Sequence, residues 1–566
     1  MRTFIICLNL IFCWGMAGAQ LFQPVDYPKT EFRNPLAIPI SLSANFGEIR
    51  SNHFHMGLDI RTQHRESLPV YAAADGYIAR IKIEPFGFGQ ALYIRHPNGY
   101  ITLYAHLNAF NPALASYVKK KQYELEKWDA FFDIPAGLFP VRKGNLIAYS
   151  GNKGGSQGPH LHFEIREYPG DINLNPMLFG LPVSDNTPPE IRKLAVYDRN
   201  KSIYEQSPVF YPVKHAGSQY TLPLSLIEVN TTSVGFGISG FDTQTGSSNP
   251  NGIYQAVIYD NQQPVSGFRM DHISYNDTRG INAHIDYRTK AMGGPYYQLL
   301  FSLPGYDHSI YKQVNGGYIK LSDEKIHDIR IELKDAYGNT SNLNFKVRYR
   351  PGQPVNTLFE GKNFYPFMVD GFESEDCAFY LGERSLYDSV HVAYGAVDVN
   401  TAGVVSRLHH VGTPSVPLQD SITVRIRITK PAGDKSHVLM QWFSRDDEEV
   451  KRVEWQGDWA TASFLSFGDF QLVNDTEAPQ ISFPGIVENA NLSRSSRIAV
   501  LVRDNYKKIK NFRATLDGHW LLFSNDKARA FIYDFDEHCL SGKHELRIHV
   551  EDEAGNVSEA VLHFTR

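Results

Sequence analysis

The amino-acid sequence predicts a mainly β protein with several domains. Its 566 residues exceed the size of one hydrophobic core, which seldom grows beyond about 200–300 residues, so about three to four domains are expected. The chain has 44 glycines and 31 prolines, and short runs of alternating apolar and polar residues lie between them. This pattern is typical of short strands joined by turns and not of helical bundles.

The overall charge excludes one class of partner. The chain has 56 basic and 61 acidic residues, and 42% of its residues are hydrophobic, which is typical of a folded globular protein. Nucleic-acid binding usually requires a strongly basic surface. We therefore expect no nucleic-acid partner.

Residues 1–19 have the pattern of a signal peptide. Arg2 supplies a positive start, residues 4–16 are almost entirely apolar, and the small residues 17–19 form a cleavage site. The apolar run is too short for a permanent membrane anchor, and no later stretch is long and apolar enough for one. We expect an exported protein of the periplasm, the cell envelope or the extracellular space.

The four cysteines divide into two pairs. Cys7 and Cys13 would leave with the signal peptide, and the bulky Phe12 before Cys13 argues against lipidation there. Cys377 and Cys539 would remain, as a disulfide or as two buried free thiols. No Cys-x-x-Cys pair is present, so a cysteine zinc site is not expected.

Residues 20–184 contain short predicted strands and one interruption. Strands are expected at 68–73, 77–83, 90–95 and 100–104, because turn-forming residues separate these segments. Good helix formers follow from Pro112 to Trp128, which predicts a helical insertion at about 112–138.

Two pairs of similar segments, called echoes here, indicate the domain organisation of the rest of the chain. Residues 185–191 resemble 475–481, and 334–339 resemble 551–556, where Asp followed by Gly-Asn predicts a hairpin turn after a strand. The echoes resemble bacterial immunoglobulin-like or fibronectin-like β-sandwiches. We therefore expect an immunoglobulin-like domain with insertions at 185–350, a β domain of unknown type at 351–474 and an immunoglobulin-like domain at 475–566.

Three histidine motifs lie in the first domain, at residues 53–59, 104–107 and 158–164. In the third motif, His160, His162 and Glu164 alternate with apolar residues. On a strand the two histidines therefore share one face, while the apolar residues enter the core. The glycine-rich residues 151–158 that precede them can bring backbone close to a ligand.

These residue types suit a catalytic zinc site. His55, Asp59 and His162 would form a His2Asp ligand set that leaves one position for water. Zinc makes such a water acidic enough to act as a nucleophile near neutral pH. His106 and His160 could then transfer protons or stabilise a developing oxyanion.

The order of the motifs resembles that of the lysostaphin-like or LytM-type zinc metallopeptidases. His-x3-Asp is followed by Tyr-Ala-His and then by Gly-Pro-His-Leu-His-Phe-Glu. Segments 68–76 and 141–148 also look like parts of that family, so the resemblance spans about residues 40–170.

This resemblance implies a small antiparallel β-fold that cleaves peptide bonds in peptidoglycan. It implies that His55, Asp59 and His162 are the zinc ligands. It also implies that His106 and His160 are the catalytic pair beside the activated water.

Three neighbouring residues have alternative interpretations. His53 could compete as a ligand, but the family spacing favours His55, which lies four residues before Asp59. Glu164 could support a ligand or face solvent on its strand. Tyr104 could donate to an oxyanion, although a packed aromatic residue is the simpler interpretation.

The leading functional hypothesis is a secreted zinc endopeptidase that hydrolyses peptidoglycan stems or cross-links, because every ligand and catalytic position is filled. The alternative is a non-catalytic wall-binding or amidase-activating protein on the same fold. A third hypothesis makes the protein an envelope adhesion or scaffold protein with an incidental protease domain. The C-terminal β domains would be spacers or would bind an envelope protein partner.

Overall fold

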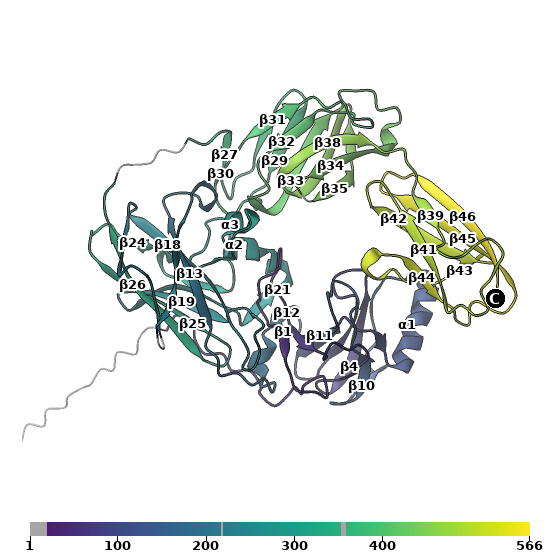
Figure 1. Ribbon diagram of the computed structural model, residues 1–566, viewed down its shortest axis with the longest axis horizontal. Coiled ribbons are helices and arrows are strands. Elements are labelled where there is room, and N and C mark those ends of the chain that lie inside the picture. Colours follow the sequence, from purple (N-terminus) through teal and green to yellow (C-terminus); the bar gives the residue numbers. More distant parts are fainter. Residues whose placement is uncertain (1–19, 217–218, 353–357, 446) are drawn as a thin grey trace, which may run out of the picture.

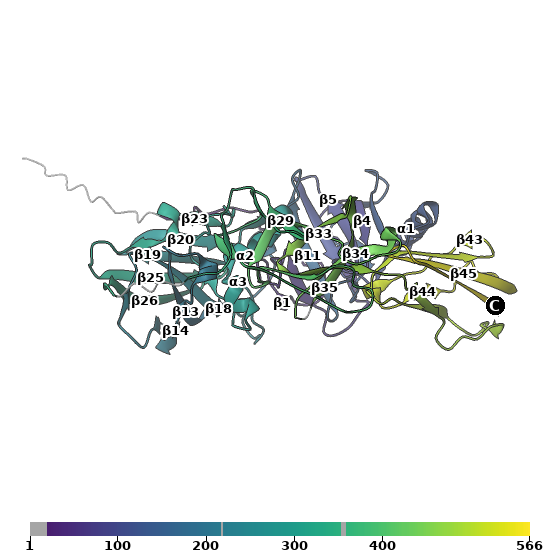
Figure 2. The same cartoon turned by 90° about the horizontal axis from the view of Figure 1, so that it is seen from above.

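A computed structural model of the chain describes residues 20–216, 219–352, 358–445 and 447–566. The expected signal peptide lies outside the described residues. Four β-rich parts follow one another around a ring (Figure 1), which is flat when seen from above (Figure 2). The predicted fold class, mainly antiparallel β with one helical insertion in the first domain, is confirmed. No helix among the described residues is long and apolar enough to cross a membrane.

The N-terminal part, residues 20–183, is built on a large antiparallel sheet with the order β1-β2-β11-β6-β5-β4-β8, beside a small sheet with the order β3-β10-β7. Its strands are β1 (Leu42–Ala44), β2 (Leu58–Arg61), β3 (Pro69–Tyr71), β4 (Gly76–Ile83), β5 (Gln90–Arg95), β6 (Tyr100–Ala105), β7 (Ala109–Phe110), β8 (Ala130–Asp133), β9 (Pro140–Val141), β10 (Leu146–Tyr149), β11 (His160–Glu167) and β12 (Ile172–Leu174).

The helical insertion is α1 (Pro112–Leu125). The Asn111 side chain caps its first turn by accepting from the Leu114 amide, and Pro112 at the first position needs no amide partner. Leu114 and Val118 bury one face of the helix in the core of the N-terminal part. The helix thus packs on the sheet and leaves its lysines on the outer side.

The second part, residues 184–352, has two packed sheets with the orders β14-β13-β18-β22 and β15-β16-β26-β25-β19-β20-β23. Two short helices, α2 (Ile281–His284) and α3 (Tyr287–Ala291), lie between its strands β21 and β22. Its strands are β13 (Glu190–Asp198), β14 (Val209–Pro212), β15 (Lys214–Ala216), β16 (Gln219–Thr221), β17 (Leu226–Val229), β18 (Ser233–Phe241), β19 (Gln255–Asp260), β20 (Gln263–Arg269), β21 (His272–Ser274), β22 (Gln298–Leu299), β23 (Tyr311–Gln313), β24 (Ile319–Lys320), β25 (His327–Lys334) and β26 (Thr340–Tyr349).

The third part, residues 358–474, pairs a sheet of order β28-β29-β33-β37-β36 with one of order β31-β32-β38-β34-β35. Its strands are β27 (Lys362–Phe364), β28 (Asp370–Glu373), β29 (Cys377–Leu381), β30 (Val390–Val392), β31 (Tyr394–Val397), β32 (Leu408–Val411), β33 (Pro417–Arg427), β34 (Val438–Phe443), β35 (Glu448–Arg452), β36 (Glu454–Gln456), β37 (Trp459–Ser466) and β38 (Gly468–Asn474).

The fourth part, residues 475–566, pairs a sheet of order β39-β41-β44 with one of order β40-β46-β45-β42-β43. Its strands are β39 (Gln480–Ser482), β40 (Ala490–Asn491), β41 (Arg497–Arg503), β42 (Ile509–Leu516), β43 (His519–Trp520), β44 (Phe531–Asp534), β45 (Lys543–Asp552) and β46 (Val557–Thr565). Cys539 is buried here and Cys377 in the third part, both as free thiols.

Neighbouring parts share structure. Strand β21 of the second part pairs with β12 and so extends the sheet of the N-terminal part. Phe46, Phe54 and Met56 of the N-terminal part belong to a core cluster that otherwise lies in the second part. One larger cluster runs through the second and third parts. The parts therefore pack directly against one another and are not separate domains joined only by linkers.

The fourth part closes the ring against helix α1 (Figure 1). The Lys119 ammonium lies 2.7 Å from an Asp536 carboxylate oxygen. The Tyr123 ring stacks on His538 with 3.8 Å between the ring centroids. Residues more than 400 positions apart in the sequence thus come into direct contact.

A second contact closes the ring beside the histidine motifs. The Gly154 amide donates to Asp526 at 2.8 Å, and the Lys527 ammonium donates to the Ser156 carbonyl at 2.6 Å. A turn of the fourth part therefore holds the glycine-rich loop that leads into β11.

Replacing Tyr123 by Ala tests the closure. The variant loses the stack on His538, and aromatic pairs contribute about 0.5–1.5 kcal/mol beyond their buried area. We expect faster hydrogen exchange over residues 519–540 in Tyr123→Ala. Tyr117→Ala is the matched control, since Tyr117 lies on the same helix but contacts Phe132 and Phe139. Equal exchange in both variants would contradict the contact.

Candidate active site

Strand pairing brings the three histidine motifs together. In the antiparallel register of β2 and β11, Asp59 lies opposite His162. On the other side of β11, His162 lies opposite Ala105 at the end of β6, so His106 follows directly beside it. The structure brings all five residues proposed from the sequence, His55, Asp59, His106, His160 and His162, into one site.

Three donor atoms converge from His55, Asp59 and His162. His55 Nε2 lies 3.0 Å from Asp59 Oδ1 and 3.1 Å from His162 Nδ1, and the last two atoms are 2.9 Å apart. Four ligands at about 2.0–2.1 Å from a zinc ion would stand slightly farther from one another. The donor set and its spacing therefore fit a zinc ion, and the three side chains are buried.

The other ring nitrogen of His55 and of His162 is held in place. His55 Nδ1 lies 2.7 Å from the Asn45 carbonyl, and His162 Nε2 lies 2.8 Å from Glu164 Oε1. Such partners fix the orientation of a ligating imidazole and make it more basic. They leave His55 Nε2 and His162 Nδ1 as the nitrogens available to an ion.

Glu164 is fully buried beneath the site. Its carboxylate lies 2.6 Å from Arg166 Nη2 and accepts from Asn173 at 2.7 Å and from the Tyr275 hydroxyl at 3.3 Å. The structure thus favours the supporting interpretation of Glu164 over a solvent-facing one. Burial opposes ionisation, but the Arg166 guanidinium and His162 lower the pKa of Glu164 to about 2.

His106 and His160 stand beside the donor atoms. Their ring centroids are 4.7 Å apart. His106 Nδ1 lies 2.7 Å from the Lys153 carbonyl, and His160 Nδ1 lies 2.8 Å from the Gly158 carbonyl. His106 Nε2 is therefore the nitrogen available to a substrate, whereas His160 Nε2 lies 3.3 Å from Asp59 Oδ1.

The electrostatics of the site favour a bound cation. Burial alone would raise the pKa of the Asp59 carboxyl, but His55, His160 and His162 hold it well below its usual range. Burial, together with the neighbouring His160 and His162, lowers the pKa of His106 to about 3. His106 is therefore neutral near pH 7 and can accept a proton.

The structure also shows where His53 and Tyr104 lie, the two other residues with alternative interpretations. His53 is exposed on the wall of the cleft and is not part of the three-residue donor cluster. Tyr104 is fully buried, and its hydroxyl accepts from the Ala73 amide at 2.8 Å. Tyr104 is thus a packed aromatic residue.

The site opens into a cleft of about 1070 Å³ between the first two parts. Lys82, Phe88 and the loop around Ser156 line it from the N-terminal part, and Tyr275 and Tyr296 line it from the second part. The second part is therefore a wall of the site.

Comparison with known families locates a recognised domain here. The family described as Peptidase family M23 matches residues 53–123, which include His55, Asp59 and His106. The chain contains an M23 peptidase domain. His160 and His162 lie beyond the matched range. A Zu5-like domain matches residues 368–475, within the third part of the chain.

Curated relatives resemble about a quarter of the chain. The DD-carboxypeptidase/endopeptidase Mpg of Neisseria meningitidis serogroup B is 36% identical over 136 residues, which is 24% of each chain. The peptidoglycan DD-endopeptidase ShyA of Vibrio cholerae is 31% identical over 122 residues, 21% of this chain and 22% of that one. The chain thus spans about a quarter of the length of these relatives.

Among solved structures, the catalytic domain of lysostaphin from Staphylococcus simulans is 22% identical and has a TM-score of 0.19. The aligned region covers 25% of this chain and 91% of that domain.

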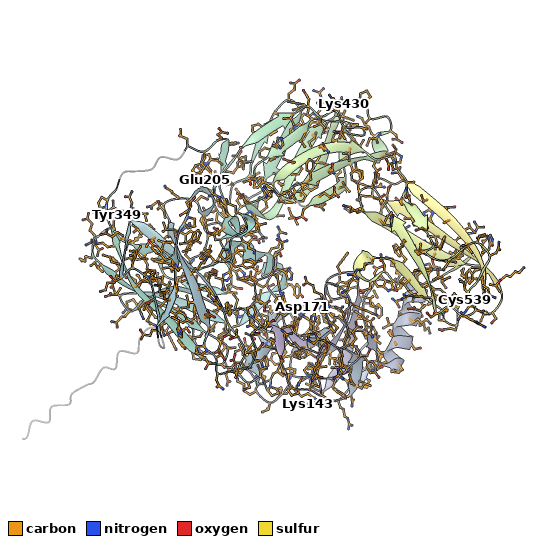
Figure 3. The ribbon with its side chains drawn as sticks, viewed as in Figure 1. Lys143, Asp171, Glu205, Tyr349, Lys430 and Cys539 are labelled. Carbon is orange, nitrogen blue, oxygen red and sulfur yellow. The ribbon has the colours of Figure 1, made fainter. Side chains whose placement is uncertain are left out.

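Sequence reasoning missed the residues that support the donor atoms of His55, Asp59 and His162. Arg166 had a local signal, because it continues the alternation of His160, His162 and Glu164 along β11. Asn45 and Tyr275 had none, since they meet the site only through the fold. The Arg166 guanidinium also reaches Asp171, which Figure 3 labels at the inner side of the ring.

Gly57 is predicted to be essential for metal binding by the M23 domain. A Cβ atom at this position would lie 2.4 Å from the Phe163 carbonyl and 3.0 Å from His162 Nε2. Gly57→Ala should therefore displace β11 and lower the zinc content of the purified protein. Gly158→Ala is the control, because a Cβ there meets no atom within 4 Å. Full zinc content in Gly57→Ala would refute this packing constraint.

Glu164→Gln should weaken the metal site without removing a ligand. Loss of such a supporting group typically costs about 10–100-fold in metal affinity. We expect that loss in chelator competition, with an unchanged circular dichroism spectrum. Glu167→Gln, an exposed position on the same strand, should keep the affinity of the parent protein. An unchanged affinity in Glu164→Gln would show that this carboxylate does not support His162.

Proposed function

We propose that the chain is an exported zinc-dependent endopeptidase that hydrolyses peptide bonds in the stems or cross-links of peptidoglycan. The observation that carries this proposal is the convergence of His55 Nε2, Asp59 Oδ1 and His162 Nδ1 within 3.1 Å of one another. The M23 match and the relatives named as peptidoglycan endopeptidases support it.

His55, Asp59 and His162 would hold the zinc ion. A zinc ion at this place supplies a Lewis acid for the scissile carbonyl and activates a water molecule. His106, which is neutral near pH 7, takes up a proton at Nε2 and can return it to the leaving amine. His160 Nε2, 3.3 Å from Asp59 Oδ1, is placed to donate to a developing oxyanion.

The cleft walls would position the peptide. Lys82 and Arg50 line the cleft and are paired there with acidic side chains, Lys82 with Glu84 and Arg50 with Glu48 and Asp59. Tyr275 and Tyr296 offer flat aromatic surfaces from the second part. The signal-like residues 1–19 support export to the cell envelope, where peptidoglycan lies.

Two substitutions separate binding of zinc from catalysis. His162→Ala should lose both zinc and the digestion of purified peptidoglycan. His106→Ala should keep its zinc and lose activity by about 10²–10⁴-fold, the usual contribution of general acid–base catalysis. His53→Ala is the control and should keep both properties, because His53 lies outside the donor cluster.

Mass analysis of the released fragments would identify the bond that is cut. Wild-type protein that carries zinc and binds wall fragments but never cuts them would overturn the proposal. That outcome would support a non-catalytic wall-binding or amidase-activating protein.

A further inference from the structure

Two clusters of three aspartates lie outside the M23 site. Asp185, Asp242 and Asp335 form the first, and one carboxylate oxygen of each lies within 4.8 Å of the others. Asp475, Asp504 and Asp552 form the second in the same way. In each cluster, two aspartates come from the two echoed sequence motifs of the β unit. The third, Asp242 or Asp504, directly follows a strand that lies between these motifs in the sequence, β18 or β41.

The first cluster has an acceptor without a donor. Asp185 Oδ1 accepts from the Thr187 and Thr245 amides, and Asp335 Oδ1 accepts from the Asn339 amide at 2.8 Å. Asp242 is only 3% exposed, yet its Oδ1 has no hydrogen-bond partner in the described structure. A buried carboxylate oxygen of this kind is costly unless a cation binds it.

The charge of the first cluster is also uncompensated. None of its three carboxylates forms an ion pair with Lys or Arg in the described part of the chain. Burial, with the nearby charges of Asp335 and Asp185, raises the pKa of Asp242 to about 8. The protein thus gathers negative charge where it supplies no positive side chain.

The second cluster repeats the construction of the first. The Asn339 amide group donates to the Asp185 carbonyl and to Asp335 Oδ2, at 3.3 and 2.6 Å. Asn556 donates in the same way to the Asp475 carbonyl and Asp552 Oδ2, at 3.0 and 2.8 Å.

Asp504 matches Asp242 in a further respect. Its Oδ1 is also a buried oxygen without a hydrogen-bond partner among the described residues. The same unpartnered acceptor therefore occurs at the equivalent position of both β units. A chance arrangement of surface acids would not reproduce this detail.

We propose that each aspartate cluster binds one calcium ion. All three side chains of each cluster offer oxygen, the donor that hard cations such as Ca²⁺ prefer, and neither cluster contains an imidazole or a thiol for zinc. Ca²⁺ takes six to eight oxygens in flexible geometry, so backbone carbonyls and water would complete the shell.

Each calcium site lies at a joint of the ring. Asp185 is in the connection from the M23 domain to the second part, and Asp475 is in the connection from the third part to the fourth. A cation that ties such a connection to two other loops of its β unit would stiffen that joint. The two sites thus act on the shape of the ring.

The first site also lies close to a zinc ligand. The Asp242 backbone pairs with Asn251, and the next residue, Gly252, exchanges two hydrogen bonds with the Asn45 side chain. The Asn45 carbonyl in turn lies 2.7 Å from His55 Nδ1. Calcium at the first site would therefore brace the segment that orients His55.

Calcium binding to the full-length, zinc-loaded protein tests the proposal by isothermal titration with CaCl₂. We expect two ions per chain, with dissociation constants of about 10⁻⁴–10⁻³ M, as in extracellular calcium modules. Asp242→Asn should abolish one site and Asp504→Asn the other, while Asp420→Asn, an exposed aspartate outside both clusters, should keep two. MgCl₂ in place of CaCl₂ should bind at least tenfold more weakly.

Thermal unfolding provides an independent readout that distinguishes calcium binding from a merely structural role. Without calcium and above pH 8, where Asp242 ionises, Asp242→Asn should raise the unfolding midpoint, because it removes repulsion between buried carboxylates. With saturating calcium, the parent protein should gain more stability than Asp242→Asn. A parent protein with no stoichiometric calcium binding, or an Asp242→Asn variant that keeps two ions, would overturn the proposal while leaving the zinc site untouched.

Discussion

The antiparallel register between β2 and β11 is the constraint on which the site depends. It sets Asp59 opposite His162, while the pairing of β11 with β6 places His106 beside them. A slip of one residue would turn the whole β11 histidine face into the core. Leu161, Phe163 and Ile165 prevent such a slip, because they are fully buried on the opposite face.

A line of alternating charge continues from the site into the protein. His162, Glu164 and Arg166 follow one another on the same face of β11, and each contacts the next. Buried charges are tolerated only where they are paired and hydrogen-bonded, and here each one is. The line ends at Tyr275, so the second part of the chain takes part in fixing the position of His162.

Much of the site could be predicted from the sequence, because its ligands lie in short motifs with a period of two. The positions of His160 and His162 on one strand face, and the core positions of Leu161 and Phe163, follow from that period. Asn45 and Tyr275 could not be found in this way, since their roles arise from contacts between distant segments. The glycine-rich loop lines the cleft through residues 155–158, and Gly154 packs its backbone against Gly89.

The fold, like the site, has some features with a local sequence signal and others without one. The β units and the α1 insertion have local signals in turn residues and helix formers. The closure of the ring has none, because it rests on single contacts such as Tyr123 with His538. Strand periodicity likewise does not indicate that Phe54 and Met56 pack into the core of the neighbouring part.

The turn at Asp526 and Lys527 has a consequence for the order of folding. Its hydrogen bonds to Gly154 and Ser156 join the rim of the cleft to a segment more than 370 positions further along the sequence. The strands that carry the histidines can pair before this brace exists. The rim therefore acquires its final form only when the fourth part has folded and docked.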